Sequence, residues 1–135
     1  MLGVLLHSVM GLVGGCIYMG IEILWRGHTH WTMGIVGGLC FILIGLLDEW
    51  QKHPPMILQM VQGALIVTVI ELCTGLIVNI WLGWNVWNYY DMPFNLLGQV
   101  CLPFSIAWFF LSAVAVWAEN ALHFVCDTLT VRWRK

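Results

Sequence analysis

Charged side chains are scarce in this sequence, because Asp, Glu, Lys and Arg together make up only 9% of its 135 residues. A soluble domain carries about 25% charged residues. With 61% hydrophobic residues and a mean hydropathy of +0.88, the chain cannot cover a soluble surface, so we expect it in a lipid bilayer. It has only five basic residues and no basic patch beyond its last few residues, which argues against a nucleic-acid partner.

The motifs of common enzymes are also missing. There is no GxxxxGK[ST] loop, so any ATP hydrolysis that serves this chain must take place in another subunit. No GxSxG, HExxH or paired-acid motif is present, and the length predicts one domain with no room for a soluble catalytic module. We therefore expect neither enzymatic activity nor a cofactor.

Patterns for thiol chemistry or metal binding are weak. The five cysteines are spread about one per hydrophobic segment and contain no CxxC pair, which is typical of small apolar residues inside helices. His28 and His30 flank one residue in a short loop, with only Glu22 as a further ligand at suitable spacing, so we assign no metal site. The other histidines are expected to be isolated interfacial residues: His7, His53 and His123.

Four long apolar segments dominate what is present. Each approaches the roughly 20 residues that a membrane-spanning helix needs, and they cover residues 3–25, 32–50, 56–82 and 93–118. Because the backbone must satisfy its own hydrogen bonds in lipid, we predict an all-α polytopic membrane protein with four helices in a compact bundle. Pro103 is expected to kink the fourth helix. Residues 119–135 are predicted to form a short cytoplasmic or interfacial extension, for which a helix and an irregular tail both stay open.

The distribution of basic residues predicts the orientation. If both termini are cytoplasmic, the inside carries four basic residues, Lys52, Arg132, Arg134 and Lys135, and the outside carries only Arg26. Positive residues are retained on the cytoplasmic side. We therefore expect a multi-pass protein of the cell membrane, in bacteria the inner membrane, with both termini in the cytoplasm.

Small residues recur at helical spacing in every segment. Gly11 and Gly15 lie in the first helix, and Gly34 and Gly38 lie in the second. Small residues allow helix backbones to approach closely in lipid. The third and fourth helices carry mixed stripes of small and polar residues: Ala64, Thr68, Glu71, Gly75 and Asn79 in the third, and Gly98, Ser105 and Ser112 in the fourth. We predict that these stripes face inward, and packing alone explains the glycines and serines.

Glu71 is the sharpest candidate for function. It lies well inside the third apolar segment, where polar residues are expensive and tend to mark a site or a packing contact. We expect a protonated carboxyl, hydrogen-bonded to Thr68 or Asn79 on its own helix face. Three roles remain open: a proton carrier, a structural polar lock between helices, or a substrate counter-ion.

The other polar candidates fall in the outer half of the predicted bundle. Glu22 and Arg26 have i, i+4 spacing at the outer end of the first helix, which indicates a local ion pair or participation in a polar site with Glu71. Asn95 and Gln99 are expected in the first turns of the fourth helix. The complete set of candidates is Glu71, Thr68, Asn79, Asn95, Gln99, Glu22, Trp87 and Tyr89.

One block, residues 63–108, carries a distinctive combination of glycine, polar and aromatic residues. Its members are Gly63, Ala64, Thr68, Glu71, Gly75, Asn79, Trp87, Tyr89, Pro93, Asn95, Gly98, Gln99, Cys101, Phe104, Ser105 and Trp108. This pattern resembles the type IV ABC-transporter permease family of small bacterial integral membrane proteins. The segment from Gly11 to Glu22 and the pair Gly37-Gly38 are also similar to the family's earlier segments.

The chain departs from that family pattern in its aromatic loop. Asn88 stands where the family has Asp after Trp, Tyr90 stands where it has Ser after Tyr, and Asp91 is the candidate substitute for the acid. The resemblance implies a multi-helix membrane protein that is the permease part of a transporter.

The leading hypothesis is a permease-like component of a bacterial transporter with an unknown substrate. It would work in the lipid bilayer as a homo-oligomer or with partner membrane and ATPase subunits. The first alternative is a small proton-coupled exporter of the multidrug-resistance type. The second is a structural or accessory membrane protein that transports nothing.

Overall fold

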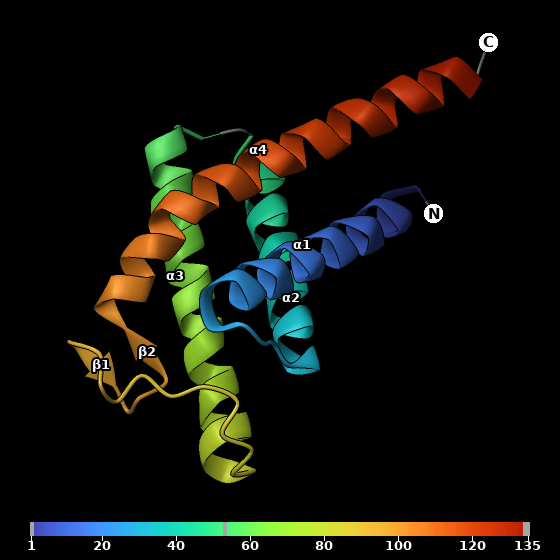
Figure 1. Ribbon diagram of the computed structural model, residues 1–135. Helices are drawn as coiled ribbons and strands as arrows, with labels where there is room; N and C mark the ends of the chain where they lie inside the picture. Colours follow the sequence, from blue (N-terminus) through green and yellow to red (C-terminus); the bar gives the residue numbers. More distant parts are fainter. Residues whose placement is uncertain (1, 53, 134–135) are drawn as a thin grey trace.

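The computed structural model describes residues 2–52 and 54–133, with side chains described for residues 3–52 and 54–129. His53, Arg134 and Lys135, which entered the sequence predictions, lie outside the described residues. The part described contains four helices that are long and apolar enough to cross a membrane. They are α1 (Leu2–Arg26), α2 (Trp31–Gln51), α3 (Met56–Gly75) and α4 (Leu102–Trp133). The predicted all-α polytopic fold is confirmed (Figure 1).

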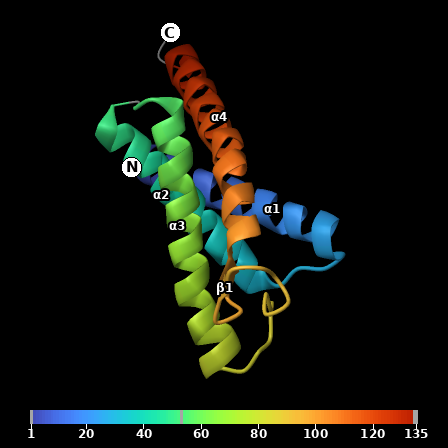
Figure 2. The same ribbon diagram turned by 90° about the vertical axis from the view of Figure 1, so that its left-hand side faces the viewer.

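The helices pack in an order that follows the chain. α1 packs mainly on α2, α3 packs mainly on α4, and α2 and α3 join the two pairs. α2 and α3 run side by side, and α1 and α4 cross them obliquely (Figures 1 and 2). The first turn of α1 and the last turn of α4 project to the same side of the molecule, as expected for a chain with an even number of spans.

Glycine brings α1 and α2 into backbone contact. A Cβ atom on Gly38 would lie 2.6 Å from the carbonyl oxygen of Gly11, and a Cβ atom on Gly15 would lie 2.6 Å from that of Gly34. Neither position has room for a larger residue, so the prediction that these glycines face inward is confirmed. α3 and α4 approach in the same way, because a Cβ on Gly63 would collide with Ser112.

The third predicted span is helical along its whole length, but its end changes geometry. After Gly75 the chain continues as a π-helix, η1 (Leu76–Trp81), so that the uninterrupted helical segment is Met56–Trp81. Gly75 packs against the Gln99 side chain, which would lie 2.5 Å from an added Cβ. A π-helical turn changes the direction in which side chains project and is frequent at functional sites. Asn79 projects from this turn.

The start of the fourth helix was predicted wrongly. Residues 93–101 do not join α4; they contain a short antiparallel hairpin of β1 (Asn95–Leu96) and β2 (Val100–Cys101), with Leu96 opposite Val100. Phe94, Leu97 and Gly98 have positive φ angles of 52°, 53° and 68°, which no right-handed helix permits. The Asn95 side chain accepts a hydrogen bond from the Gly98 N–H at 3.1 Å and stabilises this turn instead of a helix.

The other end of α4 extends beyond the predicted span, into the segment for which a helical tail was one possibility. The helix runs to Trp133 and includes residues 119–133 of the predicted tail. No glycine or proline follows Pro103 within α4, so no residue in this part of the sequence stops the helix. Pro103 is the second residue of α4, where a proline is well tolerated, and it has no preceding turn to kink.

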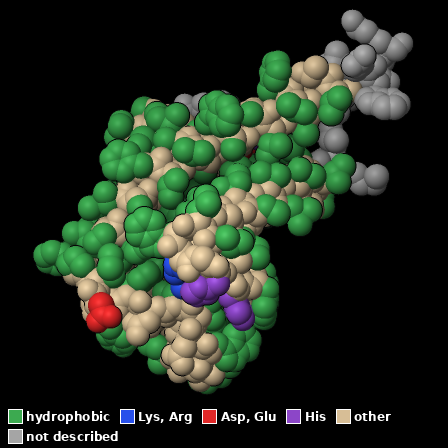
Figure 3. Space-filling model, in the orientation of Figure 1, with side chains coloured by type: hydrophobic (Ala, Val, Ile, Leu, Met, Phe, Trp, Pro, Cys, Tyr) green, Lys and Arg blue, Asp and Glu red, His purple; other side chains and the backbone are tan. Residues whose placement is uncertain are grey.

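The outer faces of the helices are strongly apolar. Large hydrophobic side chains such as Leu24, Val4 and Leu12 are 89%, 74% and 71% exposed. Hydrophobic side chains cover most of the visible surface over the helices, whereas the few charged and histidine side chains gather near the loops (Figure 3). This distribution fits helices that contact lipid and identifies a multi-pass membrane protein.

Candidate functional site

The carboxyl group of Glu71 lies at the meeting point of three helices. Glu71 belongs to α3 and is only 1% exposed. Its Oε1 accepts a hydrogen bond from the Tyr18 hydroxyl of α1, and its Oε2 accepts one from Trp108 Nε1 of α4 at 3.1 Å. The rings of Tyr18 and Trp108 stack with centroids 5.1 Å apart and planes inclined by 20°. Each carboxyl oxygen therefore has its own neutral donor.

The predicted partners of Glu71 were wrong. Thr68 Oγ1 instead lies 3.0 Å from Ser105 Oγ and links α3 to α4. Asn79 Nδ2 donates to Gln99 Oε1 at 2.8 Å. The carboxyl group bonds to larger side chains from α1 and α4 and not to residues of its own helix. These side chains reach Glu71 only because α1 and α4 pack on α3.

Asn79 and Gln99 organise the loop between η1 and α4. The Asn79 Oδ1 accepts a hydrogen bond from the Val86 N–H at 2.7 Å. The indole of Trp87, which is 4% exposed, donates to the carbonyl of Gln99 at 2.9 Å. Gln99 Nε2 donates to the Leu97 carbonyl at 2.8 Å. The structure thus brings three of the sequence candidates, Asn79, Gln99 and Trp87, into one network that fixes the loop on the end of η1.

Glu22 and Arg26 form the predicted ion pair, with Arg26 Nη2 lying 2.8 Å from Glu22 Oε2. Arg26 Nη1 also donates to the Val86 carbonyl at 3.0 Å, and Thr29 Oγ1 donates to Glu22 Oε2 at 3.1 Å. The pair therefore does more than stabilise one helix, because it connects the end of α1 to the same loop that Asn79 of η1 binds.

A cavity of about 450 Å³ lies between the end of α1, this loop and the start of α4. This volume is in the range of small-molecule sites. Its wall is mainly apolar and aromatic, and it is lined by Ile21, Glu22, Leu24, Trp25, Arg26, Tyr89, Met92, Pro103, Phe104, Ala107, Trp108 and Leu111. Trp108 is shared, because it lines the cavity and donates its N–H to Glu71.

Tyr89 gives the cavity a polar group on its loop side. Its ring stacks on Phe104 with centroids 4.8 Å apart. Burial, followed by the charge of Glu71, raises the pKa of the Tyr89 phenol well above its ordinary value. The hydroxyl is therefore protonated at neutral pH and is available as a hydrogen-bond donor.

Not all candidates join this region. Asn95 stabilises its own turn, where its Nδ2 donates to the carbonyls of Met92 and Tyr90 at 3.0 and 3.1 Å. Thr68 bonds to Ser105, and the oxygens of Glu71 bond to other side chains. The two residues that sequence reasoning missed are Tyr18 and Trp108. A signal for both was present: Tyr18 lies between Gly15 and Glu22 on the first small-residue stripe, and Trp108 closes the 63–108 block.

The comparisons with known proteins place nearly the whole chain in one family. The family model described as "Putative ABC-transporter type IV" matches residues 4–133. The comparison with curated proteins and the comparison with solved structures found no match. Because the family match covers almost every residue, including α1 to α4 and the loop, the chain belongs to the family "Putative ABC-transporter type IV".

Proposed function

We propose that this chain is a permease-like integral membrane component of a bacterial transporter. Its family supports a role in an ABC-type transporter, and its four apolar helices support a position in the bilayer. The chain has no nucleotide-binding loop, so the proposal assigns ATP hydrolysis to a partner subunit and no enzymatic activity to this chain.

The observation that carries the proposal is the junction between Glu71 and the cavity. Trp108 contacts both, and Tyr18 stacks on Trp108 while it donates to Glu71. A solute in the cavity that shifts the Trp108 ring would therefore change the hydrogen bonding of a buried carboxyl group shared by three helices. Such a junction can couple occupancy of the cavity to the packing of α1, α3 and α4.

The proposal also includes assembly with other subunits. Four helices are too few to form a two-lobed transport pathway through the membrane. Further copies of this chain or partner membrane subunits would therefore supply the rest of that pathway. The exposed apolar faces of α1 and α4 are compatible with such contacts as well as with lipid. We place the protein in the bacterial inner membrane with both termini in the cytoplasm, which the count of basic residues supports.

One alternative has an observation in its favour. A buried glutamate in the middle of a span, as in α3, is also the arrangement that a small proton-coupled exporter requires. In that case the driving force would be a pH gradient, and no ATPase would be needed. The accessory hypothesis treats the same hydrogen bonds as a structural lock alone.

These hypotheses are separated by transport measurements in proteoliposomes. The chain is reconstituted with and without the ATPase encoded nearest to it, and flux of a solute panel is measured under ATP or under a pH gradient. We expect ATP-dependent flux that needs both proteins and that is lost in Glu71→Gln. The matched control is Thr68→Val on the same helix, which should keep its flux because Thr68 bonds only to Ser105 among the contacts described.

Other results would overturn the proposal. Flux driven by a pH gradient without the ATPase would establish the exporter. If no solute moves under either condition, and Glu71→Gln only lowers stability, the chain is an accessory protein and Glu71 is a structural lock.

A further inference from the structure

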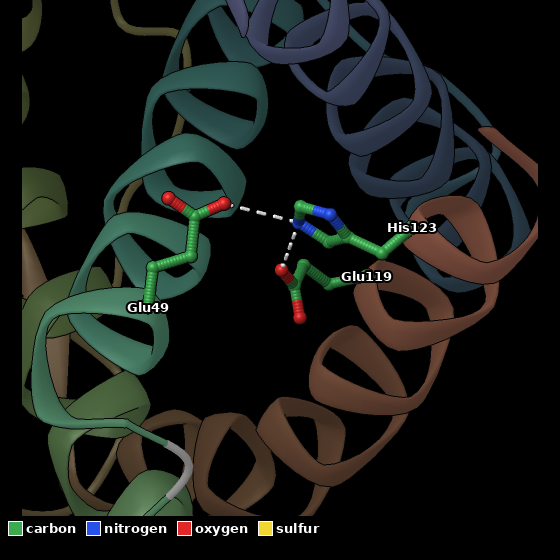
Figure 4. A group of neighbouring side chains, drawn as sticks. All are labelled: Glu49, Glu119 and His123. Carbon is green, nitrogen blue, oxygen red and sulfur yellow. Dashed lines mark ion pairs between the residues drawn. The ribbon is translucent and has the colours of Figure 1, made fainter. Parts of the chain in front are cut away.

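A second group of ionisable side chains lies between α2 and α4, separate from the Glu71 site. Glu49 comes from the last turns of α2, and Glu119 and His123 come from α4. His123 Nε2 lies 2.7 Å from Glu119 Oε1 and 3.1 Å from Glu49 Oε1. One ligand atom from each residue lies within 4.8 Å of the other two. The side chains of Glu119 and His123 project from α4 toward Glu49 of α2 (Figure 4).

His123 makes close contacts with two carboxylates at the same ring nitrogen. Nε2 is buried and lies between Oε1 of Glu119 and Oε1 of Glu49. A single N–H can point straight at only one of these two oxygens, whereas an ion held by all three atoms accounts for both short separations.

A metal ion explains this geometry. In a metal site the imidazole lone pair points at the ion, while the other ligand atoms lie about 40° off that axis and about 3 Å from the ring nitrogen. These values follow from metal–ligand bonds of about 2.0–2.2 Å that meet at angles of about 90–110°. The observed separations of 2.7 and 3.1 Å are close to that arrangement.

Glu119 supplies an independent observation. Its side chain is only 2% exposed, and its Oε2 is buried without a hydrogen-bond partner among the described residues. Asp48, which precedes Glu49, also interacts electrostatically with Glu119, so two further acids act on this carboxylate. A buried carboxylate oxygen without a donor is costly unless it is paired or coordinates a metal.

We propose that Glu49, Glu119 and His123 bind a divalent transition-metal ion of the Zn²⁺ class and thereby connect α2 to α4. The mixed nitrogen and oxygen ligand set favours such ions over Ca²⁺ or Mg²⁺, which select oxygen ligands. Glu119 and His123 have i, i+4 spacing, which places two ligands on one face of a helix. Three protein ligands leave one position of a tetrahedral ion for water. The site shares no residue with the Glu71 site, so the proposal does not depend on transport.

The test is metal binding by the whole chain, purified in lipid nanodiscs and stripped with a chelator. Titration calorimetry with Zn²⁺ should give one ion per chain. Glu119→Gln and His123→Gln should each weaken the affinity roughly tenfold or more, since each removes one of three protein ligands. Co²⁺ should give the visible absorption of a nitrogen- and oxygen-ligated ion, and this band should be lost in His123→Gln.

The control is His28→Gln, which removes an exposed histidine in the loop between α1 and α2 and should leave Zn²⁺ affinity and the Co²⁺ band unchanged. Glu49→Gln is the variant that should still fold normally, because this partly exposed side chain can be replaced without disturbing the helix packing. It should also weaken Zn²⁺ binding. Absence of stoichiometric Zn²⁺ binding to the parent protein would overturn the proposal. So would an affinity that the Glu49, Glu119 and His123 variants leave unchanged.

Discussion

Glu71 and Glu119 are both buried carboxylates on membrane-length helices, with exposures of 1% and 2%, but their surroundings differ. Glu71 has a neutral donor on each oxygen, from Tyr18 and Trp108. Glu119 faces His123 and two further acids, and one of its oxygens has no hydrogen-bond partner among the described residues. The hydrogen bonds of Glu71 are all made by side chains of this protein. The side chains around Glu119, in contrast, have the composition of an ion-binding site.

The comparison shows why burial alone does not define a role. A carboxyl group that is fully hydrogen-bonded by neutral side chains can connect helices without any ligand. A convergence of carboxylates needs a compensating cation, because like charges repel strongly where water is scarce. The two regions should therefore respond differently to mutation and to metal.

The largest expected effect concerns the donors of Glu71. Glu71→Ala leaves the Tyr18 hydroxyl and the Trp108 indole N–H buried without an acceptor, so we expect a loss of about 2 kcal/mol in the free energy of unfolding. The measurement is unfolding by SDS titration in mixed micelles, followed by tryptophan fluorescence. Metal should not restore this loss. An unchanged stability would show that the hydrogen bonds to Glu71 contribute nothing to helix association.

A smaller effect is expected where Asn79 holds the loop. Asn79→Ala removes the acceptor of the Val86 N–H and the donor to Gln99, so we expect a loss of about 1 kcal/mol. Hydrogen exchange should become faster at Val86 and Trp87, while exchange in α2 stays slow. Uniformly faster exchange throughout the chain would contradict a local role for Asn79.

The smallest effect is expected at Glu49, whose side chain is 40% exposed. Without metal, Glu49→Gln should change the free energy of unfolding by no more than about 0.5 kcal/mol, as for other exposed charges. With Zn²⁺ present, the parent protein should gain thermal stability and this variant should gain less. If Zn²⁺ raised the thermal stability of both proteins equally, Glu49 would not be a ligand of the ion. The proposed difference between the Glu71 and Glu119 regions would then rest on Glu119 and His123 alone.

Several features could be predicted from local patterns. Three of the four spans begin and end close to the predicted residues, since the apolar length of a span is a property of contiguous sequence. The glycine contacts of Gly11, Gly15, Gly34 and Gly38 follow from their spacing on helices that must approach in lipid.

The hairpin before α4 was missed, because its turn depends on backbone angles of single residues. Leu97 adopts a positive φ that its residue type does not predict. The apolar character of residues 93–101 resembles the start of a span, so hydropathy joined them to α4. The sequence left open whether the residues after 118 are helical, since their polar residues resemble a tail.

The sequence by itself determined the membrane-spanning class, the inward glycines and the ion pair of Glu22 with Arg26, because each depends on residues that are close in the chain or on total composition. Only the tertiary structure decided which side chains meet Glu71, since Tyr18 and Trp108 are 53 and 37 residues away from it. The same holds for Glu49 and the α4 pair of Glu119 and His123, which meet only where α2 and α4 come together. Spacing along one helix predicts which residues share a face, but the rotation and crossing of two helices decide which faces meet.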